Sequence, residues 1–304
     1  MVSKILPSYV ALICSALLYG FTVFGAKIMS LNGFSLIEIL IIPNLIVVLA
    51  LAIFVRPEFK KFYGVPLGIS LLYFLAIVVC QIGQFTPIFL GLSVSMTVFL
   101  LYSQPLWTTL ISIILGTRFT HKDAVLIVIT FTGLVFLLAP WKEFSFSVWG
   151  FVLALLGGIS LSLWIVISSR YYVKQHLKPT SITFFTNIYQ SVPFMLALPL
   201  FQIFGAPKSL SAFSINHASA QWVFVFIYSL LVFVGAQILF YKAAKKINAI
   251  HLGLVLLLEP LVALMLDTFF LGTPLTAHIL FGGALIMAAN AYLIIQSAQK
   301  EIKE

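Results

Sequence analysis

Apolar residues form long runs along the whole chain, and short polar clusters separate one run from the next. Each run contains about 20 residues, the length that a helix needs to cross the hydrocarbon core of a membrane. Because the bilayer core offers no water to backbone amides, such segments are expected to be helical. The pattern therefore predicts an all-α membrane protein with ten transmembrane helices, at roughly 9–29, 36–55, 65–89, 96–115, 123–140, 147–169, 180–204, 221–241, 249–270 and 277–297.

The composition agrees with this class. The chain is 62% hydrophobic and only 8% charged, whereas a soluble domain is about one quarter charged. The first apolar run follows MVSKILPSYV, which contains no small-residue cleavage site. We therefore expect that run to remain as the first transmembrane helix and not to be removed as a signal peptide.

The cationic residues are distributed unevenly between the two sides of the predicted membrane. One side holds the N-terminus, every second loop and the C-terminus, with 14 of the 17 Lys and Arg residues. Such an excess is typical of cytoplasmic loops and explains the net charge of +9 better than a nucleic-acid partner does. We expect a multi-pass protein of the plasma (bacterial inner) membrane with both termini in the cytoplasm. The 14 residues are Lys4, Arg56, Lys60, Lys61, Arg118, Lys122, Arg170, Lys174, Lys178, Lys242, Lys245, Lys246, Lys300 and Lys303; the other three are Lys27, Lys142 and Lys208.

Two pairs of segments repeat along the chain. QPLWTTLISIILGTRFT begins at Gln104, and EPLVALMLDTFFLGTPLT begins at Glu259. ALLYG begins at Ala16, and ALLGG begins at Ala154. Each pair falls on matching helices of two five-helix halves, which indicates an internal duplication.

An odd number of helices in each half has a geometric consequence. The second half must insert with the opposite orientation, and inverted repeats of this kind are typical of transporters whose substrate site lies near the midplane. The sequence thus predicts ten transmembrane helices as two inverted five-helix repeats, residues 1–142 and 143–304, joined near residues 140–147.

Together with Gly133 and Gly282–Gly283 in the closing helix of each half, these motifs resemble the EamA-like ten-helix group of the drug/metabolite transporter superfamily. The resemblance covers essentially the whole chain. It implies transport of a small organic metabolite, such as an amino acid or a related compound. The chain departs from the family pattern at Thr117 and Thr273, where the family often has Leu-Gly-Glu, and at Asn44, where it often has an arginine.

Glu259 lies about halfway along the ninth predicted helix and precedes Pro260. An ionised side chain at that depth costs roughly 2.5–3.5 kcal/mol on insertion scales. Proline kinks a helix and frees a carbonyl one turn earlier, and freed carbonyls at membrane depth face protein or a water-filled cavity. Two interpretations stay open: a hydrogen bond that holds helices together, or a substrate site at which Glu259 is the candidate for proton coupling.

Other polar and aromatic residues lie near midspan in several helices. Interhelical hydrogen bonds worth about 0.6 kcal/mol each would explain many of them singly. As a set they predict a substrate-binding pocket formed by Asn44, Gln81, Gln84, Tyr102, Gln104, Trp107, Trp164, Asn187, Gln190, Gln237 and Glu259. Asp267 and Lys27 lie near the outer ends of their helices, where interfacial solvation and snorkelling explain them. The glycine pairs at 157–158 and 282–283 predict close helix packing.

No motif of an ATPase, a nucleotide-binding protein or a metalloenzyme occurs in the sequence. We therefore expect no cofactor, no metal site and no catalytic residues. The prediction is a secondary transporter that works by alternating access on a small-molecule substrate, in contact with membrane lipids, as a monomer or homodimer. The alternatives are a lipid or lipid-linked sugar translocator, a membrane-embedded enzyme, and a non-transporting receptor or assembly subunit.

Overall fold

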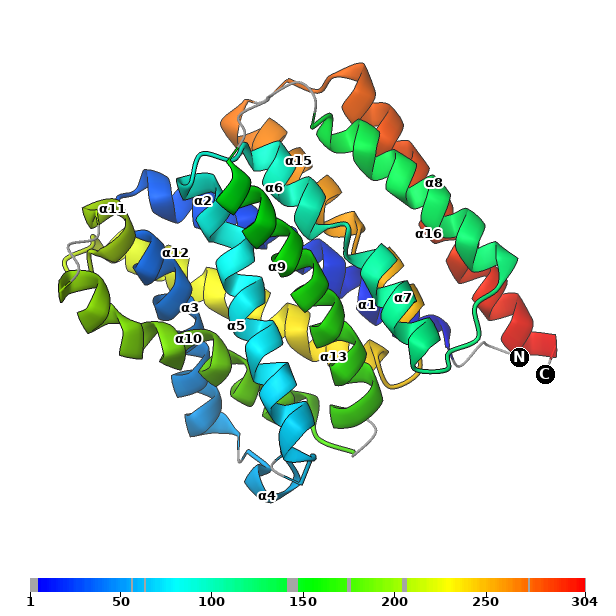
Figure 1. The fold of residues 1–304 in the computed structure, drawn as a ribbon, viewed down its shortest axis with the longest axis horizontal. Coiled ribbons are helices and arrows are strands. Elements are labelled where there is room, and N and C mark those ends of the chain that lie inside the picture. The colour runs from blue at the N-terminus through cyan, green and yellow to red at the C-terminus, as the bar shows by residue number, and fades with distance from the viewer. Residues whose placement is uncertain are drawn as a thin grey trace.

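The computed structural model describes residues 5–55, 57–62, 64–140, 147–173, 176–203, 207–272 and 274–303. Within these ranges every regular element is a helix, and the helices pack side by side (Figure 1). The predicted all-α class is confirmed. The predicted boundary between residues 142 and 143 lies outside the described residues, as do Lys4, Arg56, Lys142, Lys174 and Thr273.

The first half crosses the fold five times, and two of its crossings are interrupted. The elements are α1 (Leu6–Tyr19) with α2 (Phe21–Leu31), α3 (Leu36–Phe54), α5 (Leu67–Phe89), α6 (Val94–Leu101) with α7 (Gln104–Ile114), and α8 (His121–Leu138). The short helix α4 (Phe59–Phe62) lies between α3 and α5.

The second half repeats this order. Its elements are α9 (Val148–Ile167) with the π-helical η1 (Ser168–Tyr172), α10 (Pro179–Ile203), α12 (Ser219–Tyr228) with η2 (Ser229–Ala236) and α13 (Gln237–Ala243), α14 (Ala249–Val255) with α15 (Leu258–Leu271), and α16 (Ala277–Lys303). The short helix α11 (Lys208–Ser211) lies between α10 and α12.

Nine segments of the described chain are long and apolar enough to cross a membrane. The seventh predicted crossing corresponds to α10, which is 25 residues long but less apolar than its neighbours. Its polar side chains at Ser181, Thr183, Thr186, Asn187 and Ser191 are all buried. These side chains face protein and not lipid. Helix α10 can therefore be long enough to cross the membrane although its mean hydropathy is lower than that of its neighbours.

Contacts between the halves follow a two-fold pattern. Equivalent helices pack on each other in the pairs α3 with α10 and α8 with α16, and α7 of the fourth crossing packs on α14 of the ninth. The packing of α5 on α9 is matched by the packing of α13 and η2 on α1. With five crossings in each half, this arrangement confirms two inverted repeats.

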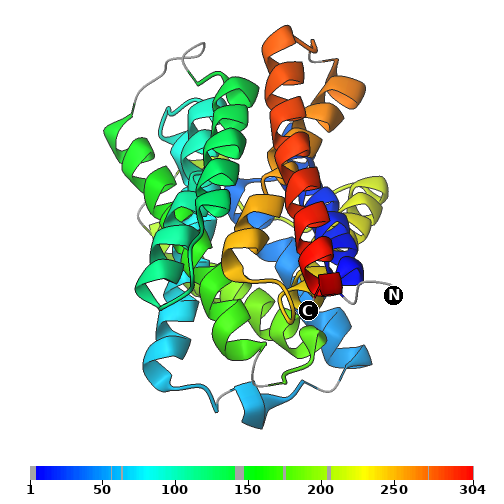
Figure 2. The same ribbon diagram turned by 90° about the vertical axis from the view of Figure 1, so that its right-hand side faces the viewer.

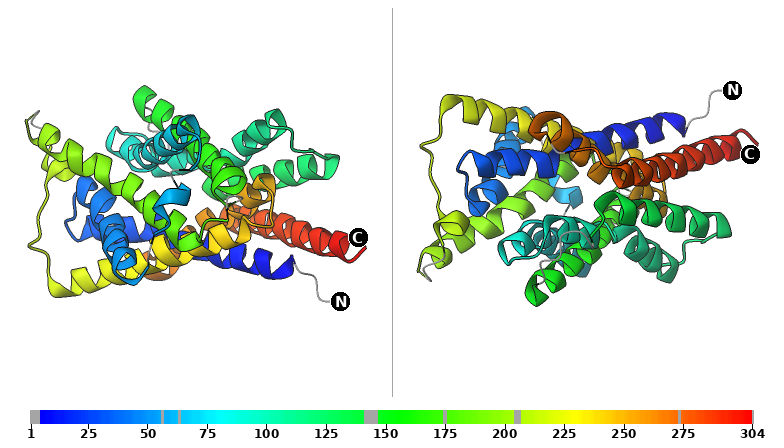
Figure 3. Two further views of the ribbon diagram at one scale, coloured as in Figure 1. Left: turned by 90° about the horizontal axis from the view of Figure 1, so that it is seen from below. Right: turned by 90° about the horizontal axis from the view of Figure 1, so that it is seen from above.

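The two ends of the chain lie at the same end of the helix bundle (Figures 2 and 3). The hydroxyl groups of Tyr9 near the start of α1 and Ser297 near the end of α16 are 2.9 Å apart. We call the end of the bundle that carries both termini the terminal face, and the other end the opposite face.

Glycines allow two of these helix pairs to approach closely. A Cβ atom added at Gly83 of α5 would lie 2.5 Å from the Cα of Gly157 in α9, and one added at Gly133 of α8 would lie 2.8 Å from the carbonyl oxygen of Gly282 in α16. Any side chain would force the helices apart. The prediction that the glycine pairs at 157–158 and 282–283 permit close packing is confirmed.

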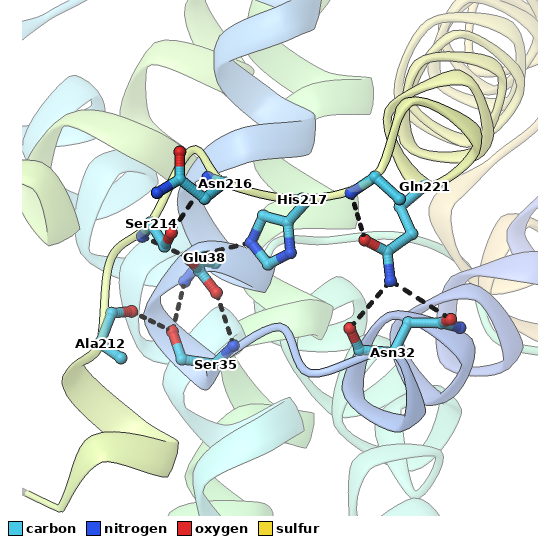
Figure 4. Close-up of polar contacts among 9 residues, drawn as sticks. Asn32, Ser35, Glu38, Ala212, Ser214, Asn216, His217 and Gln221 are labelled. Atoms are coloured by element: carbon cyan, nitrogen blue, oxygen red, sulfur yellow. Dashed lines mark hydrogen bonds and ion pairs between the residues drawn. The ribbon is translucent and has the colours of Figure 1, made fainter.

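At the opposite face, Glu38 fastens the long segment before α12 to the start of α3 (Figure 4). Its carboxylate accepts hydrogen bonds from the backbone amides of Ser35 at 2.7 Å and Ser214 at 2.6 Å. The Nε2 atom of His217 lies 3.3 Å from the same carboxylate, and the imidazole ring stacks on Phe34 with centroids 3.8 Å apart. A buried charge needs partners of this kind, and here they hold a loop in place.

Candidate substrate cavity

The fourth and ninth crossings are each interrupted near the middle. Helix α6 ends at Leu101 and α7 begins at Gln104, while α14 ends at Val255 and α15 begins at Leu258. Pro105 and Pro260 occupy the first turn of the second segments, where a missing N–H leaves no helical hydrogen bond unmade. The kink predicted at Pro260 is thus confirmed, as a two-residue turn at residues 256–257 shortly before the proline.

The first crossing of each half passes directly against the interruption in the other half. A Cβ atom added at Gly158 would lie 2.6 Å from the carbonyl oxygen of Leu100, and one added at Gly20 would lie 3.2 Å from that of Glu259. These two glycines end the repeated ALLYG and ALLGG segments. The repeat therefore places a glycine in the first crossing of each half, at the point where that crossing passes the interrupted helix of the other half.

A cavity of about 80 Å³ lies between the two interruptions. One water molecule needs roughly 10–15 Å³ of such space. The cavity is therefore large enough for several waters or a small polar group. Both halves contribute to its lining, which consists of Tyr19, Thr22, Ile77, Cys80, Gln81, Gln84, Leu101, Tyr102, Leu161, Trp164, Gln190, Phe233, Gln237, Leu256 and Glu259.

Seven of the eleven predicted site residues line this cavity: Gln81, Gln84, Tyr102, Trp164, Gln190, Gln237 and Glu259. Glu259 is buried, and the hydroxyl group of Tyr102 lies against its carboxyl group. Among the described lining residues Glu259 is the only acidic or basic side chain, because the set contains no lysine, arginine, histidine or aspartate. The cavity thus combines one acid with amides and aromatic rings.

Asn187 lies one layer behind the cavity wall. Its Nδ2 atom donates to the Thr183 carbonyl at 2.8 Å and to Oε1 of Gln237 at 3.1 Å. Nε2 of Gln237 in turn lies 3.5 Å from Oε1 of Gln190. Asn187 therefore orients Gln237 and does not itself line the cavity.

The remaining three predicted residues make their contacts away from the cavity. Gln104 is fully buried, donates from Nε2 to the Gly253 carbonyl at 2.7 Å and accepts from the Thr108 hydroxyl at 2.9 Å. Asn44 donates to the Leu40 carbonyl within its own helix, and the Trp107 indole donates to Ser103. None of the three lines the cavity.

Three polar lining residues were absent from the sequence prediction: Tyr19, Thr22 and Cys80. Tyr19 immediately precedes Gly20, so the repeated ALLYG segment was an available signal. Thr22 is buried, and its hydroxyl has no hydrogen-bond partner within the described part of the chain. Cys80 gave no signal beyond its position next to Gln81.

A second, mostly apolar hollow of about 240 Å³ adjoins the cavity and shares Gln84 and Leu101 with it. Lys27 and Leu31 of α2 also line this hollow. Both lie near the end of the first crossing, which reaches the opposite face. The hollow therefore extends the cavity toward that face.

Comparisons with known proteins agree with this architecture. Residues 148–295 match the model of the EamA-like transporter family. An "uncharacterized transporter" from Archaeoglobus fulgidus is 26% identical over 195 residues, which are 64% of this chain and 65% of the relative. The alignment thus spans slightly less than two thirds of that relative's length.

A solved crystal structure shares the fold with a TM-score of 0.73, covering 93% of this chain and 96% of the other at 18% identity. The family match begins where α9 begins and ends within α16, so it spans the five crossings of one repeat. The second repeat is thus similar to the EamA-like transporter family, in agreement with the resemblance seen in the repeated motifs.

Proposed function

We propose that the protein is a secondary transporter that moves a small organic metabolite, such as an amino acid or a related compound, through the central cavity by alternating access. The observation that carries the proposal is the position of Glu259. It is a buried acid in a cavity that both halves line, next to two interrupted helices. Discontinuous helices at the interface of inverted repeats form the substrate sites of many transporters.

The chemistry of the lining suits an amino acid or a related amine. Glu259 would bind the ammonium group, and the side-chain amides of Gln81, Gln84 and Gln237 would donate to the polar remainder of the substrate. The rings of Tyr19 and Trp164 would contact its apolar part. A multiply charged anion fits poorly, because no cation is present among the described lining residues.

Glu259 is also the candidate for proton coupling. An unpaired carboxylate inside the bilayer is costly, so Glu259 would carry either a proton or a cationic group in every state of the cycle. Binding of an ammonium group would displace the proton, and the transport step would carry one or the other. This exchange would couple substrate movement to a proton gradient.

We propose a plasma-membrane location with both termini in the cytoplasm. The support is the excess of lysine and arginine on the predicted side of the membrane that holds both termini, 14 against three in the sequence. The positive-inside rule assigns such a face to the cytoplasm.

A binding screen followed by a transport assay tests the proposal. A thermal-shift screen of the purified protein against a metabolite library identifies ligands, because a ligand that binds the folded state raises its apparent stability. Counterflow of a hit in proteoliposomes then compares the wild type with Glu259→Gln and with Glu58→Gln, a matched change of a carboxylate in a loop. We expect Glu259→Gln to lose transport by roughly tenfold or more and Glu58→Gln to retain it.

Two outcomes would contradict the proposal. Full transport by Glu259→Gln at every pH would remove the proton-coupling role. Phospholipid translocation without counterflow of any soluble metabolite would instead favour a lipid translocator.

A further inference from the structure

In the fourth and ninth crossings, the second helical segment is α7 or α15. The end of each of these segments contacts the first crossing of the other half. In the ninth crossing, Asp267 of α15 forms an ion pair with Lys27 of α2, with 2.9 Å between Oδ2 and Nζ. The two residues are 240 positions apart in the chain. The contact lies on the opposite face, where α2 and α15 both end.

The fourth crossing has a corresponding tie on the terminal face. The guanidinium group of Arg170 in η1 donates to the Leu115 carbonyl at 2.8 Å and to the Ser112 carbonyl at 3.5 Å, and it also bonds the Thr117 hydroxyl. The last carbonyls of a helix have no partner within it, and a cation near a helix C-terminus interacts favourably with them. Arg170 thus fastens the end of α7 to the extension of α9.

The acceptor ends of the two ties occupy equivalent places in the repeat, whereas Arg170 lies five residues beyond the position that matches Lys27. The offset that aligns Gln104 with Glu259 also aligns Ser112 with Asp267. In each tie a cation of one half's first crossing reaches the interrupted crossing of the other half. Because the halves are inverted, one tie lies on each face of the membrane.

We propose that these contacts are the two gates of the transport cycle: Lys27–Asp267 holds the opposite face closed, and Arg170 with the end of α7 holds the terminal face closed. The inference rests on the proposed function, since it requires a cavity that opens to either face in turn. Opening to one face requires separation of the first crossing of one half from the interrupted crossing of the other. The ties span these two junctions.

The two gates differ in strength. The Lys27 and Asp267 side chains are 45% and 22% exposed, and exposed ion pairs contribute little stability. Arg170 makes several charge-assisted hydrogen bonds, which are stronger. The apolar hollow also lies beside Lys27. The protein therefore opens more readily toward the opposite face.

Chemical labelling of Cys80 tests the gates without any substrate. Cys80 lines the cavity, and the other cysteine, Cys14, is removed as Cys14→Ala. A membrane-impermeant maleimide is added to sealed vesicles of either orientation. We expect Lys27→Met or Asp267→Asn to speed labelling from the opposite face by roughly two- to fivefold, and Arg170→Met to speed labelling from the terminal face by roughly tenfold or more.

Three further variants make the test specific. Lys61→Met removes an exposed cation that pairs with Glu58 three residues away and does not join the halves, so labelling stays at the Cys14→Ala level. The exchange Lys27→Asp with Asp267→Lys restores the original rate. Arg170→Lys keeps the charge but cannot span two carbonyls, so an intermediate rate is expected, and this variant replaces Arg170→Met if the latter does not fold.

The gate proposal would be contradicted if a gate variant sped Cys80 labelling equally from both faces, or if no gate variant sped it at all. This outcome is distinct from failure of the proposed function. Retained transport in Glu259→Gln would remove the coupling role of that residue but would leave the side-specific labelling of Cys80 intact.

Discussion

Gln104 and Glu259 occupy matching places in the repeat, but their side chains have different surroundings. Gln104 forms a buried hydrogen bond to the carbonyl of Gly253 across the interface between the halves. Glu259 lines the cavity. The duplicated polar position is therefore a structural contact in one half and a candidate binding group in the other.

This difference predicts separable effects of two amide substitutions. Gln104→Ala leaves the Gly253 carbonyl buried and unpaired, which costs about 1–3 kcal/mol of unfolding free energy. Gln237→Ala removes an amide from the cavity wall and weakens ligand binding with a smaller loss of stability. Thermal unfolding with and without a ligand from the screen measures both quantities. A larger ligand-binding defect in Gln104→Ala than in Gln237→Ala would contradict the assignment.

The local sequence predicted the position of some cavity residues, but it did not predict which side chains would pair with each other. Lys27 and Asp267 were attributed to snorkelling and interfacial solvation, yet they pair with each other across 240 positions. Midspan position identified Gln81, Gln84 and Glu259 as cavity residues, because polar groups are costly inside the membrane. It could not distinguish them from Asn44 and Gln104, because the rotation of each helix decides which side chains face the cavity, and Gly253, the partner of Gln104, is distant in sequence.

At the scale of the helices, hydropathy and repeat motifs predicted nearly the whole fold. The ten predicted crossings each correspond to a helix or an interrupted helix pair. Prolines alone did not identify the interruptions, since Pro43 and Pro87 lie inside continuous helices. The π-helical turns η1 and η2 were also not predicted, because their i to i+5 hydrogen bonds leave no clear sequence pattern.

Glu58 joins the loop between α3 and α5 to the start of α10. Hydrogen bonds from the Lys61 ammonium and the Lys178 backbone amide hold the pKa of Glu58 below its ordinary value. A carboxyl with a lowered pKa in the folded state stabilises the fold above its unfolded pKa, and this contribution is lost as the pH falls through the folded pKa.

The wild type should therefore lose more thermal stability than Glu58→Gln when the pH falls from about 5 to about 3. Near neutral pH the variant should be the less stable of the two. Thermal unfolding of detergent-solubilised protein across this range checks the prediction. Parallel pH curves for the two proteins would show that these hydrogen bonds contribute nothing measurable.

At the scale of the whole molecule, the inverted duplication brings two interrupted helices together around one cavity. The tie between Tyr9 and Ser297 places both termini on one face, as an even number of crossings requires. The same symmetry puts one of the two proposed gates on each face of the protein. A single cavity between two such faces is the geometry that alternating access requires.

The most direct test is the reactivity of Cys80 from each side of the membrane. In Cys14→Ala protein reconstituted with one orientation, an impermeant maleimide is applied first outside and then, in separate vesicles, inside. We predict that Cys80 reacts from both faces and that a transported ligand slows both reactions. Reaction from one face alone, or labelling that no ligand alters, would contradict a central cavity that opens alternately to the two sides.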